Sequence, residues 1–372
     1  MIPLFRPYFR IDECLNEIRG TLEKGWTGQG FLTEDFEKAW ARAVNRENCL
    51  MLNSASSALH LALEALKINR GWSDDSEIIS TPLTFVATNH AILWSGLVPV
   101  LVDVDDDLCL SPEALLENIN EKTKAVMFVA IGGGIGRIEE IKSICDEKGI
   151  ALILDASHGS GSMNLNEPIG TGCDAICYSF QAVKNLPTGD SGALSMLHSE
   201  EHDLAKKLSW LGISESTFSR SKSGGYKWEY DVDHVGYKYN ANAIMAAVAL
   251  VSLKYLDEDN EKRRNIARKY QEAIQSDNRI EVIQQSNSNE SSRHLFQVYV
   301  KDRSKVASAF LVNQIGMGVH YRSNCEYKMY SQFKKSTTNA SRLSEGILTL
   351  PMFIEITDEE QSKVIETLLS AL

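Results

Sequence analysis

The stretch from Ala151 to Met196 reads ALILDASHGSGSMNLNEPIGTGCDAICYSFQAVKNLPTGDSGALSM. Its apolar runs predict a buried strand that ends on Asp155 and His158 and a second strand that ends at Ser179. Lys184 follows between Gly- and Ser-rich turns. A lysine that comes after an acid-ended strand, a serine and a string of small residues suggests a cofactor bound through its amine.

The same alternation of apolar runs and helical patterns extends upstream. Near-continuous apolar strands separated by helices predict an α/β fold with a mainly parallel sheet covered on both faces. The predicted strands are 48–52, 77–80, 98–105, 125–131 and 150–154. The predicted helices lie near 11–24, from Thr33 as cap, from about Ala58, after the loop that begins the segment 81–93, and at 111–118 and 137–148. Ligands of such sheets bind beyond the carboxyl ends of the strands, where Ser54, Thr84, Asp155 and Ser179 should meet.

The pattern changes after about residue 214. Residues 214–240 have little periodicity and predict a long ordered loop, and residues 241–275 are strongly helical. The remainder predicts a smaller α+β domain with strands at 280–283, 294–300 and 318–321 and helices at 303–314 and 358–370. We therefore expect a large domain over 1–245 and a small one over 246–372.

Composition limits the partners. A formal net charge of −12 over 372 residues argues against nucleic acid or an anionic membrane. No apolar run approaches the roughly 20 residues that span a bilayer. The seven cysteines are scattered without a metal-binding pattern, so no metal is expected, and reduced thiols indicate a cytoplasmic compartment.

Each candidate residue has an ordinary alternative. Lys184 is either a solvated loop lysine or a Schiff-base lysine with a depressed pKa. Asp155 is either a helix N-cap or a counter-ion for a protonated pyridine nitrogen. His158 is either a core histidine or a residue that packs on a ring or contacts its phenolic oxygen.

Two further motifs also have both an ordinary and a functional interpretation. Ser54, Ser56 and Ser57 precede a helix, so they form either an N-cap or a phosphate site made by free N–H groups and the helix dipole. Phe85 is either a core residue or a ring that stacks on an aromatic cofactor. The run Gly132–Gly134 follows a strand but has no acidic ribose partner at the expected distance, so it predicts a turn.

Taken in order, these motifs resemble the DegT/DnrJ/EryC1/StrS family of sugar aminotransferases, which are pyridoxal-phosphate (PLP) enzymes of fold type I. The resemblance covers nearly the whole chain. It is carried by GWTGQGFLTEDFE (25–37), NSASSALHLAL (53–63), TPLTFVATNHAIL (81–93), DASH (155–158), SFQAVKNLPTGDSG (179–192), GYKYNANAIMAA (236–247), GVHY (318–321) and LTLPMF (348–353). It implies a seven-stranded, mainly parallel sheet and a smaller C-terminal domain.

The resemblance also implies roles around PLP. Lys184 would hold the cofactor as a Schiff base and Asp155 would contact the pyridine nitrogen. Phe85 would stack on the ring, and His158 would lie beside its O3′ edge. The phosphate would be held by Ser56, Ser57 and Ser179.

Further contacts would come from the partner subunit and from the substrate pocket. Lys238 and Asn240 would reach the neighbouring site, which makes a homodimer the minimal functional unit. Thr27, Gly28, His320 and Tyr321 would contact the sugar nucleotide. Ala55, Gln181 and Ser191 depart from the family pattern, where Gly, His and Gly are usual, and leave the substrate's identity in doubt.

The implied reaction is a ping-pong transfer from L-glutamate, released as 2-oxoglutarate, through pyridoxamine phosphate (PMP) to a nucleotide-linked keto-deoxysugar. A 4-keto-6-deoxyhexose is the first expectation and a 3-keto sugar the second. Alternatives are a PLP-dependent sugar dehydratase, against which Lys184 counts, and a catalytically idle PLP-binding regulator. A nicotinamide oxidoreductase would need a Gly-x-Gly-x-x-Gly loop after the first strand, which is absent.

Overall fold

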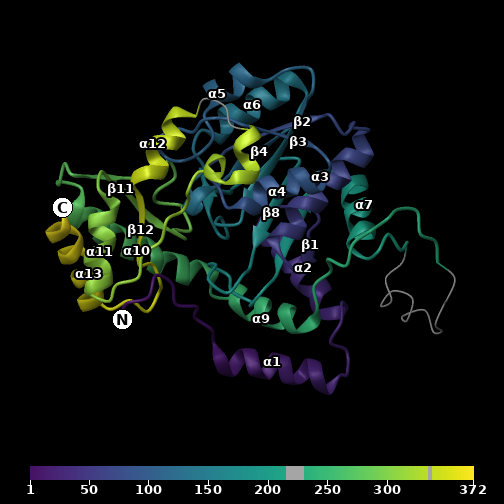
Figure 1. The fold of residues 1–372 in the computed structure, drawn as a ribbon. Helices are drawn as coiled ribbons and strands as arrows, with labels where there is room; N and C mark the ends of the chain where they lie inside the picture. Colours follow the sequence, from purple (N-terminus) through teal and green to yellow (C-terminus); the bar gives the residue numbers. More distant parts are fainter. Residues whose placement is uncertain (215–229, 334–336) are drawn as a thin grey trace.

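A seven-stranded sheet forms the centre of the computed structural model, which describes residues 1–214, 230–333 and 337–372 (Figure 1). The strand order is β1–β9–β8–β5–β4–β2–β3. Strands β3, β2, β4, β5 and β8 run parallel to their neighbours, and β9 runs antiparallel to both β8 and β1. The strands are β1 Leu50–Leu52, β2 Glu77–Ser80, β3 Val98–Leu101, β4 Thr123–Val129, β5 Ala151–Ala156, β8 Ala175–Ser179 and β9 Gly192–Met196. The predicted α/β fold with a mainly parallel sheet is confirmed.

Helices bury both faces of the sheet, which explains why its strands are apolar throughout. On one face α3 (Ala55–Arg70), α4 (Val86–Trp94) and α7 (Ser199–Ser209) pack against side chains such as Met127 and Ile153. On the other, α2 (Phe31–Ala43), α5 (Pro112–Asn118), α6 (Ile138–Lys148) and α9 (Ala243–Leu253) cover Phe128 and Leu154. Alternate residues of one strand thus enter opposite cores.

Two predicted helix starts were wrong by a few residues. Helix α3 begins at Ala55 rather than near Ala58, because Ser54 is its N-cap and accepts a hydrogen bond from Ser57 N at 3.1 Å. Helix α2 is capped by Gly30, and Thr33 lies in its first turn, where its hydroxyl accepts from Gly30 N at 2.9 Å. Small hydroxyl residues cap from either position, so the pattern alone misplaces the start.

The C-terminal region forms a second core around the antiparallel sheet β10–β11–β12. Its elements are β10 Ile280–Val282, β11 Phe296–Val300, α11 Arg303–Val312, α12 Thr338–Gly346, β12 Ile347–Leu350 and α13 Asp358–Ala371. The predicted strand at 318–321 was wrong. Only Gly318 pairs with β12, at Thr349, while the carbonyl of His320 accepts from the Gln297 side chain instead of a strand partner.

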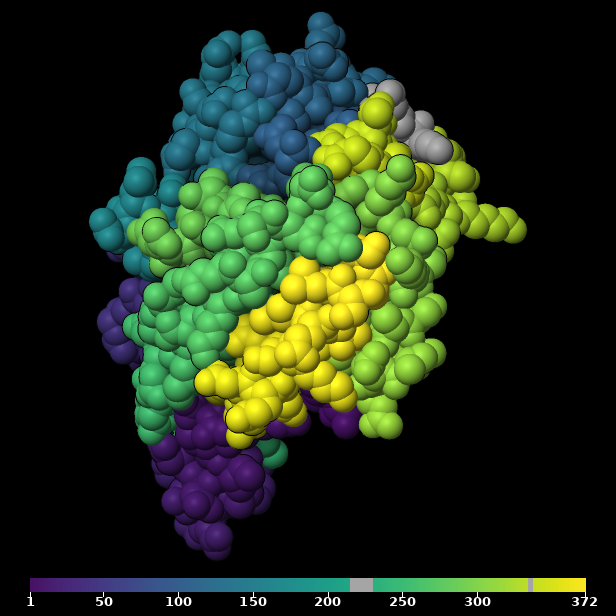
Figure 2. All heavy atoms as spheres, turned by 90° about the vertical axis from the view of Figure 1, so that its left-hand side faces the viewer, coloured from purple at the N-terminus to yellow at the C-terminus, as the bar shows by residue number. Residues whose placement is uncertain are grey.

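The helices between the two cores are α9 and α10 (Leu256–Ile274). The predicted boundary at 245 falls inside α9, which packs on the large core, whereas α10 begins on the large core at Leu256 and packs on the small one from Ile266 onward. Figure 2 shows α10 in green lying beside the yellow α13. The domain division itself stays a prediction.

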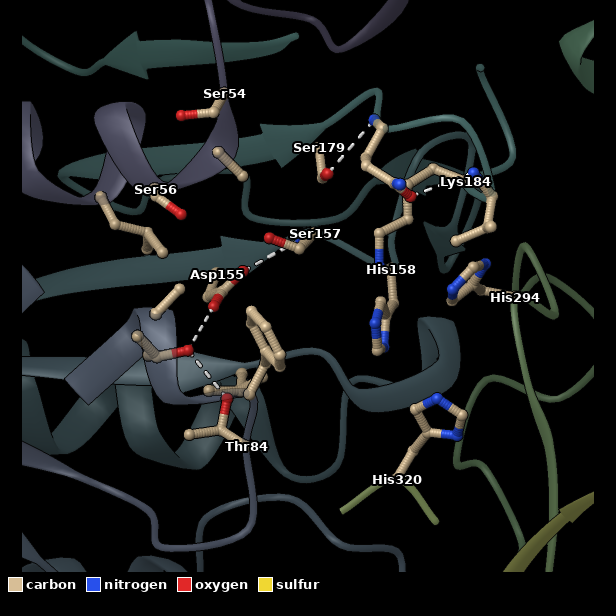
Figure 3. Close-up of a pocket in the computed structure, with 18 of the residues that line it drawn as sticks. Ser54, Ser56, Thr84, Asp155, Ser157, His158, Ser179, Lys184, His294 and His320 are labelled. Carbon is tan, nitrogen blue, oxygen red and sulfur yellow. Dashed lines mark hydrogen bonds between the residues drawn. The ribbon is translucent and has the colours of Figure 1, made fainter. Parts of the chain in front are cut away.

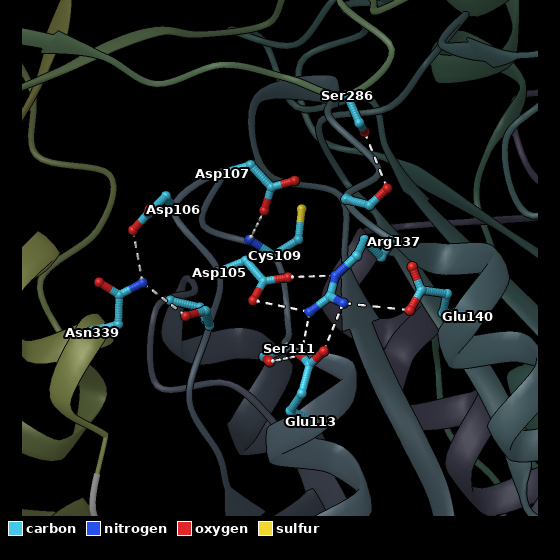
Figure 4. Close-up of polar contacts among 12 residues, drawn as sticks. Asp105, Asp106, Asp107, Cys109, Ser111, Glu113, Arg137, Glu140, Ser286 and Asn339 are labelled. Atoms are coloured by element: carbon cyan, nitrogen blue, oxygen red, sulfur yellow. Dashed lines mark hydrogen bonds and ion pairs between the residues drawn. The ribbon is translucent and has the colours of Figure 1, made fainter.

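Polar contacts fasten the two parts together around the segment after β3 (Figure 4). Asp103 accepts from the backbone N–H groups of Asn339 and Ala340 at the start of α12, at 2.9 and 2.7 Å. Within the large part, Arg137, just before α6, pairs with Asp105 at 3.0 Å and with Glu113. These contacts explain why β3 ends at Leu101 and not at 105, since the carboxylates that follow are used to bind α12 and Arg137.

The predicted ordered loop 214–240 lies mostly outside the described residues. Its described end runs back along the large core, where Lys238 bridges to Trp210 and Asn240 to Leu52. Helix α1 (Ile11–Glu23) projects from the molecule and contacts α9 (Figures 1 and 2). Over the described ranges, no helix is both long and apolar enough to cross a membrane.

Candidate active site

A cavity of about 440 Å³ opens at the carboxyl ends of the parallel strands. It collects eight of the predicted site residues, namely Ser56, Phe85, Asp155, His158, Ser179, Lys184, His320 and Tyr321. Figure 3 labels all of these except Phe85 and Tyr321. Its wall comes from loops after β1, β2, β5 and β8 and from residues of the small C-terminal core. The expectation that these strand ends converge on one site is therefore met for these residues.

Asp155 occupies the end of β5 and is only 4% exposed. Its Oδ2 accepts from the Thr88 hydroxyl at 2.7 Å, and Thr88 is in turn bonded to Thr84 at 2.8 Å. Its Oδ1 accepts from Ser157 N at 3.0 Å. Helix N-capping, the alternative, does not occur, because the segment after Asp155 is a turn. The carboxylate is instead fixed in orientation against the cavity, where it can accept a proton-bearing ring nitrogen.

Lys184 lies in the turn that joins β8 to β9, across the cavity from Asp155 (Figure 3). Backbone bonds brace this turn, including Lys184 N to Gln181 O at 2.8 Å and Thr188 N to Phe180 O at 2.9 Å. Burial lowers the pKa of the Lys184 amine to about 8, against the opposing pull of Asp155. No described residue gives its Nζ a hydrogen bond or an ion pair. The amine is thus free to act as a nucleophile.

The N-terminus of α3 forms the third side of the cavity. Ser54, Ala55 and Ser56 line it, so the helix points its free N–H groups and its positive dipole end at the cavity. Gly192 makes this approach feasible: a Cβ there would lie 2.6 Å from Ala55 N and from Tyr178 O. Such a helix end can hold a phosphate without a lysine.

Ser57 is placed differently from Ser56. Its hydroxyl bonds to Asn53 Oδ1 at 2.5 Å and to Ser54 Oγ at 2.9 Å, and it does not line the cavity. Ser179 does line it, at the end of β8. Of the three predicted phosphate serines, the structure brings two to the cavity and gives the third a role within the helix cap.

His158 has a tautomer that its neighbours define. Gly132 N donates to its Nδ1 at 3.1 Å, so the ring proton is on Nε2, which donates to the Tyr321 hydroxyl at 3.1 Å. Burial, and then the charges of Lys184 and His320, lower the pKa of His158 well below its usual value. Gly132 has a left-handed φ of 63°, so the glycine run that predicts a turn also positions this histidine.

His294 is a cavity residue that the sequence analysis did not single out. Its Nδ1 bonds to Asn185 Oδ1 at 3.0 Å, and its ring lies 4.4 Å from that of His158. Phe5 stacks on its other side at 5.6 Å. The signal available in the sequence was a histidine at the head of the apolar strand HLFQVYV; nothing marked Phe5.

Phe85 and His320 are two further residues that line the cavity. Phe85 is 59% exposed, with its ring 6.0 Å from that of Tyr321, so it is not a core residue. His320 bonds to the Thr349 hydroxyl at 2.8 Å, and burial lowers its pKa to about 4. Its imidazole is therefore neutral near pH 7.

The remaining predicted residues do not line this cavity. Lys238 lies over the Trp210 ring at 3.1 Å, and Asn240 bonds to Ala241 O at 3.0 Å. Thr27 and Gly28 are exposed, and their carbonyls accept from Ala243 N at the start of α9. Lys238 and Asn240 were predicted to contact the active site of a partner subunit, and this stays a prediction because the structure contains one protomer.

Comparison with known proteins identifies relatives along the whole chain. The spore coat polysaccharide biosynthesis protein SpsC of Bacillus subtilis (strain 168) is 32% identical over 369 residues, covering 95% of this chain and 93% of that protein. Helicobacter pylori PseC, an aminotransferase involved in the biosynthesis of pseudoaminic acid, superposes with a TM-score of 0.91 at 25% identity, covering 100% of this chain and 98% of that one. Spr1654 from Streptococcus pneumoniae, solved in its PMP form, gives the same TM-score and identity and covers 100% and 99%.

Fold, cavity and relatives together define a PLP-dependent sugar aminotransferase. Residues 10–369 match the family model, and the chain belongs to the DegT/DnrJ/EryC1/StrS aminotransferase family. The donor set of the cavity fits PLP, because it offers an unpaired amine for the aldehyde, a fixed carboxylate for the ring nitrogen and a helix N-terminus for the phosphate.

Proposed function

We propose that this enzyme transfers the amino group of L-glutamate to a keto group on a nucleotide-linked deoxysugar. A 4-keto-6-deoxyhexose is our first candidate and a 3-keto sugar the second. The observation that carries the proposal is the unpaired Lys184 amine, with a pKa of about 8, facing Asp155 across the cavity. Lys184 counts against a dehydratase, whereas an idle binding protein could hold PLP on the same amine, and the transfer assay below separates the two.

The side chains divide the work of the reaction. When bound, PLP supplies the aldehyde and the electron-accepting ring. Asp155, oriented by Thr88 and Ser157, would hold the protonated ring nitrogen. Lys184 would carry a proton to and from the substrate carbon that bears nitrogen. Its pKa near the working pH suits it to both directions of transfer.

The wall opposite the phosphate end supports a polar sugar ligand. His320 and Tyr321 present a neutral imidazole and a phenol, both able to bond sugar hydroxyls, while Phe85 offers an exposed ring beside them. SpsC and PseC are named for polysaccharide and sugar-acid biosynthesis, respectively. We therefore place the product in the synthesis of a surface polysaccharide, such as a lipopolysaccharide O-antigen, or of a glycosylated metabolite.

A homodimer with shared sites is the second part of the proposal. Helix α1 leaves Ile11, Leu15 and Leu22 more than half exposed, at 67%, 52% and 56%, and Val235 is 92% exposed. Apolar side chains in such number on a projecting helix favour burial against a second copy of the chain. In the dimer, Lys238 and Asn240 would contact the phosphate in the partner's site, and Thr27 and Gly28 would contact the sugar nucleotide.

The substrate is tested directly by incubating the PLP-loaded enzyme with L-glutamate and a panel of nucleotide-linked 4-keto and 3-keto deoxysugars. We expect 2-oxoglutarate and an amino sugar nucleotide in equal amounts from at least one of them. The Lys184→Ala protein is the control and should give neither. If no keto sugar draws 2-oxoglutarate from glutamate, while a keto acid does, the sugar assignment is wrong.

A further inference from the structure

Arg293 is a buried arginine without a partner. It is 5% exposed, its Nε is fully enclosed, and no described residue gives its guanidinium a hydrogen bond or an ion pair. A buried unpaired charge is costly, and arginine is the side chain best suited to bind a carboxylate or a phosphate in a fork. Burial lowers the pKa of Arg293 to about 10, so it still carries its charge at neutral pH.

The side chain borders a second cavity of about 450 Å³, separate from the active site. Helix α10 forms one wall with Arg264, Arg268 and Gln271, and the loop before β11 forms the other with Ser288 and Asn289. The lining is polar, with amides and a hydroxyl placed around the arginines. Such a lining suits a small anion that carries hydroxyl groups.

The charges around this cavity leave a local positive excess. Glu261 is engaged by both Arg264 and Arg268, each at 2.8 Å. Glu272 is the other acid on the wall, and it forms no ion pair with Arg293 among the described residues. Three guanidinium groups therefore face two carboxylates, on a chain whose net charge is −12.

The residues on either side of Arg293 in the chain contact the active site. Ser292 Oγ donates to His158 O at 2.7 Å, and Ser292 O accepts from Asn185 Nδ2 at 2.6 Å. His294, on the other side, lines the PLP cavity. Consecutive residues of one segment thus face the two cavities.

We propose that the cavity of Arg293 is a binding site for a small oxyanion, a carboxylate or a phosphoryl group, recognised by the Arg293 guanidinium. The bound oxyanion supplies the counter-charge that the described residues do not. This site is independent of the substrate proposed above, because its residues do not line the active-site cavity.

Calorimetric titration tests the proposal on holoenzyme reduced with borohydride, in which the cofactor already fills its own phosphate site. The probes are inorganic phosphate and malonate, with chloride at matched ionic strength. We expect saturable binding of at least one probe. At an anion concentration about a hundred times its Kd, the melting temperature should rise by about 3 °C or more. Phosphate alone would assign a phosphoryl ligand and malonate alone a carboxylate.

Two variants locate the binding. Arg293→Met should weaken binding at least about tenfold, and without anion it should melt no lower than the wild type, because a buried unpaired charge has been removed. Gln271→Glu adds a negative charge to the wall without changing its size and should weaken binding as well. Gln332→Glu makes the same change on an exposed residue outside both cavities and should bind like the wild type. Equal binding by all four proteins, or no saturable binding of either probe to the wild type, would overturn the proposal.

Discussion

At the scale of single residues, the Lys184 amine has no substitute among its neighbours. Three histidines of the cavity wall, His158, His294 and His320, have their pKa lowered by burial. Lys184→Ala should lower turnover by at least about a thousandfold, since both the tether and the acid/base are lost. Lys148→Ala, an exposed lysine paired with Glu147, is the matched control and should keep full activity. An alanine protein that transaminates at the wild-type rate would refute the assignment.

The same amine predicts a pH dependence. The folded pKa of about 8 lies below the ordinary 10.5, so the neutral, reactive form gains about tenfold per pH unit up to pH 8 and then levels off. The rate at which apoenzyme takes up PLP, followed by absorbance, should show this profile. A rate that keeps rising to pH 10 would mean that the lysine is not buried as described.

The role of Asp155 can be tested at two levels, by replacing its carboxylate and by removing a hydrogen bond that orients it. Asp155→Asn should cut kcat by roughly a hundredfold or more, because the ring nitrogen loses its counter-ion. Thr88→Val keeps the carboxylate but removes the 2.7 Å hydrogen bond that orients it, together with the bond to Thr84, and should cost about tenfold. Steady-state kinetics on both proteins measure the difference. An equal loss in the two would show that orientation, and not charge, is what matters.

At this scale the sequence was informative where a charge ends an apolar strand, as at Asp155, or lies in the turn between two of them, as at Lys184. Asp155 and Lys184 stand out because neither belongs in such surroundings without a role. His294 could not be placed in the same way, because its partner Asn185 is 109 residues away in the chain. The hydroxyl of Ser57 is another case, since only the structure shows that Asn53 has taken it.

At the scale of elements, the contact between β9 and the start of α3 sets the phosphate end of the site. Gly192→Ala would place a Cβ 2.6 Å from Ala55 N, so the helix terminus must move. We expect weaker PLP binding and a loss of stability of about 1–3 kcal/mol. Gly20→Ala, in α1 with open space around it, is the control and should leave PLP binding unchanged. Cofactor titration and thermal melts report both effects.

Helices and strands could be predicted from the sequence where one or both of their faces are buried in a core. The strands of the large sheet follow from their apolar runs, whereas the segment 318–321 has an apolar residue and aromatics but makes its contacts through side chains. Strand β12 and helix α12 were not predicted.

At the scale of the whole molecule, the proposed homodimer builds each active site from residues of both subunits. It therefore predicts that two inactive variants can complement each other in a mixed dimer. Lys184→Ala and Lys238→Ala proteins, each impaired alone, should recover activity when unfolded and refolded together. A mixed dimer then has one intact site, with Lys184 from one copy and Lys238 from the other. Random pairing gives about a quarter of the wild-type activity in a symmetric dimer. No recovery, with both proteins folded and dimeric, would show that Lys238 does not act in the partner's site.

The most direct test of the central claim is reduction of the PLP-loaded enzyme with borohydride, followed by peptide mass analysis. The yellow colour should disappear, and a single pyridoxyl group should be found on Lys184. A pyridoxyl group on another lysine, or a cofactor that washes away after reduction, would contradict the assignment of Lys184 as the residue that binds PLP.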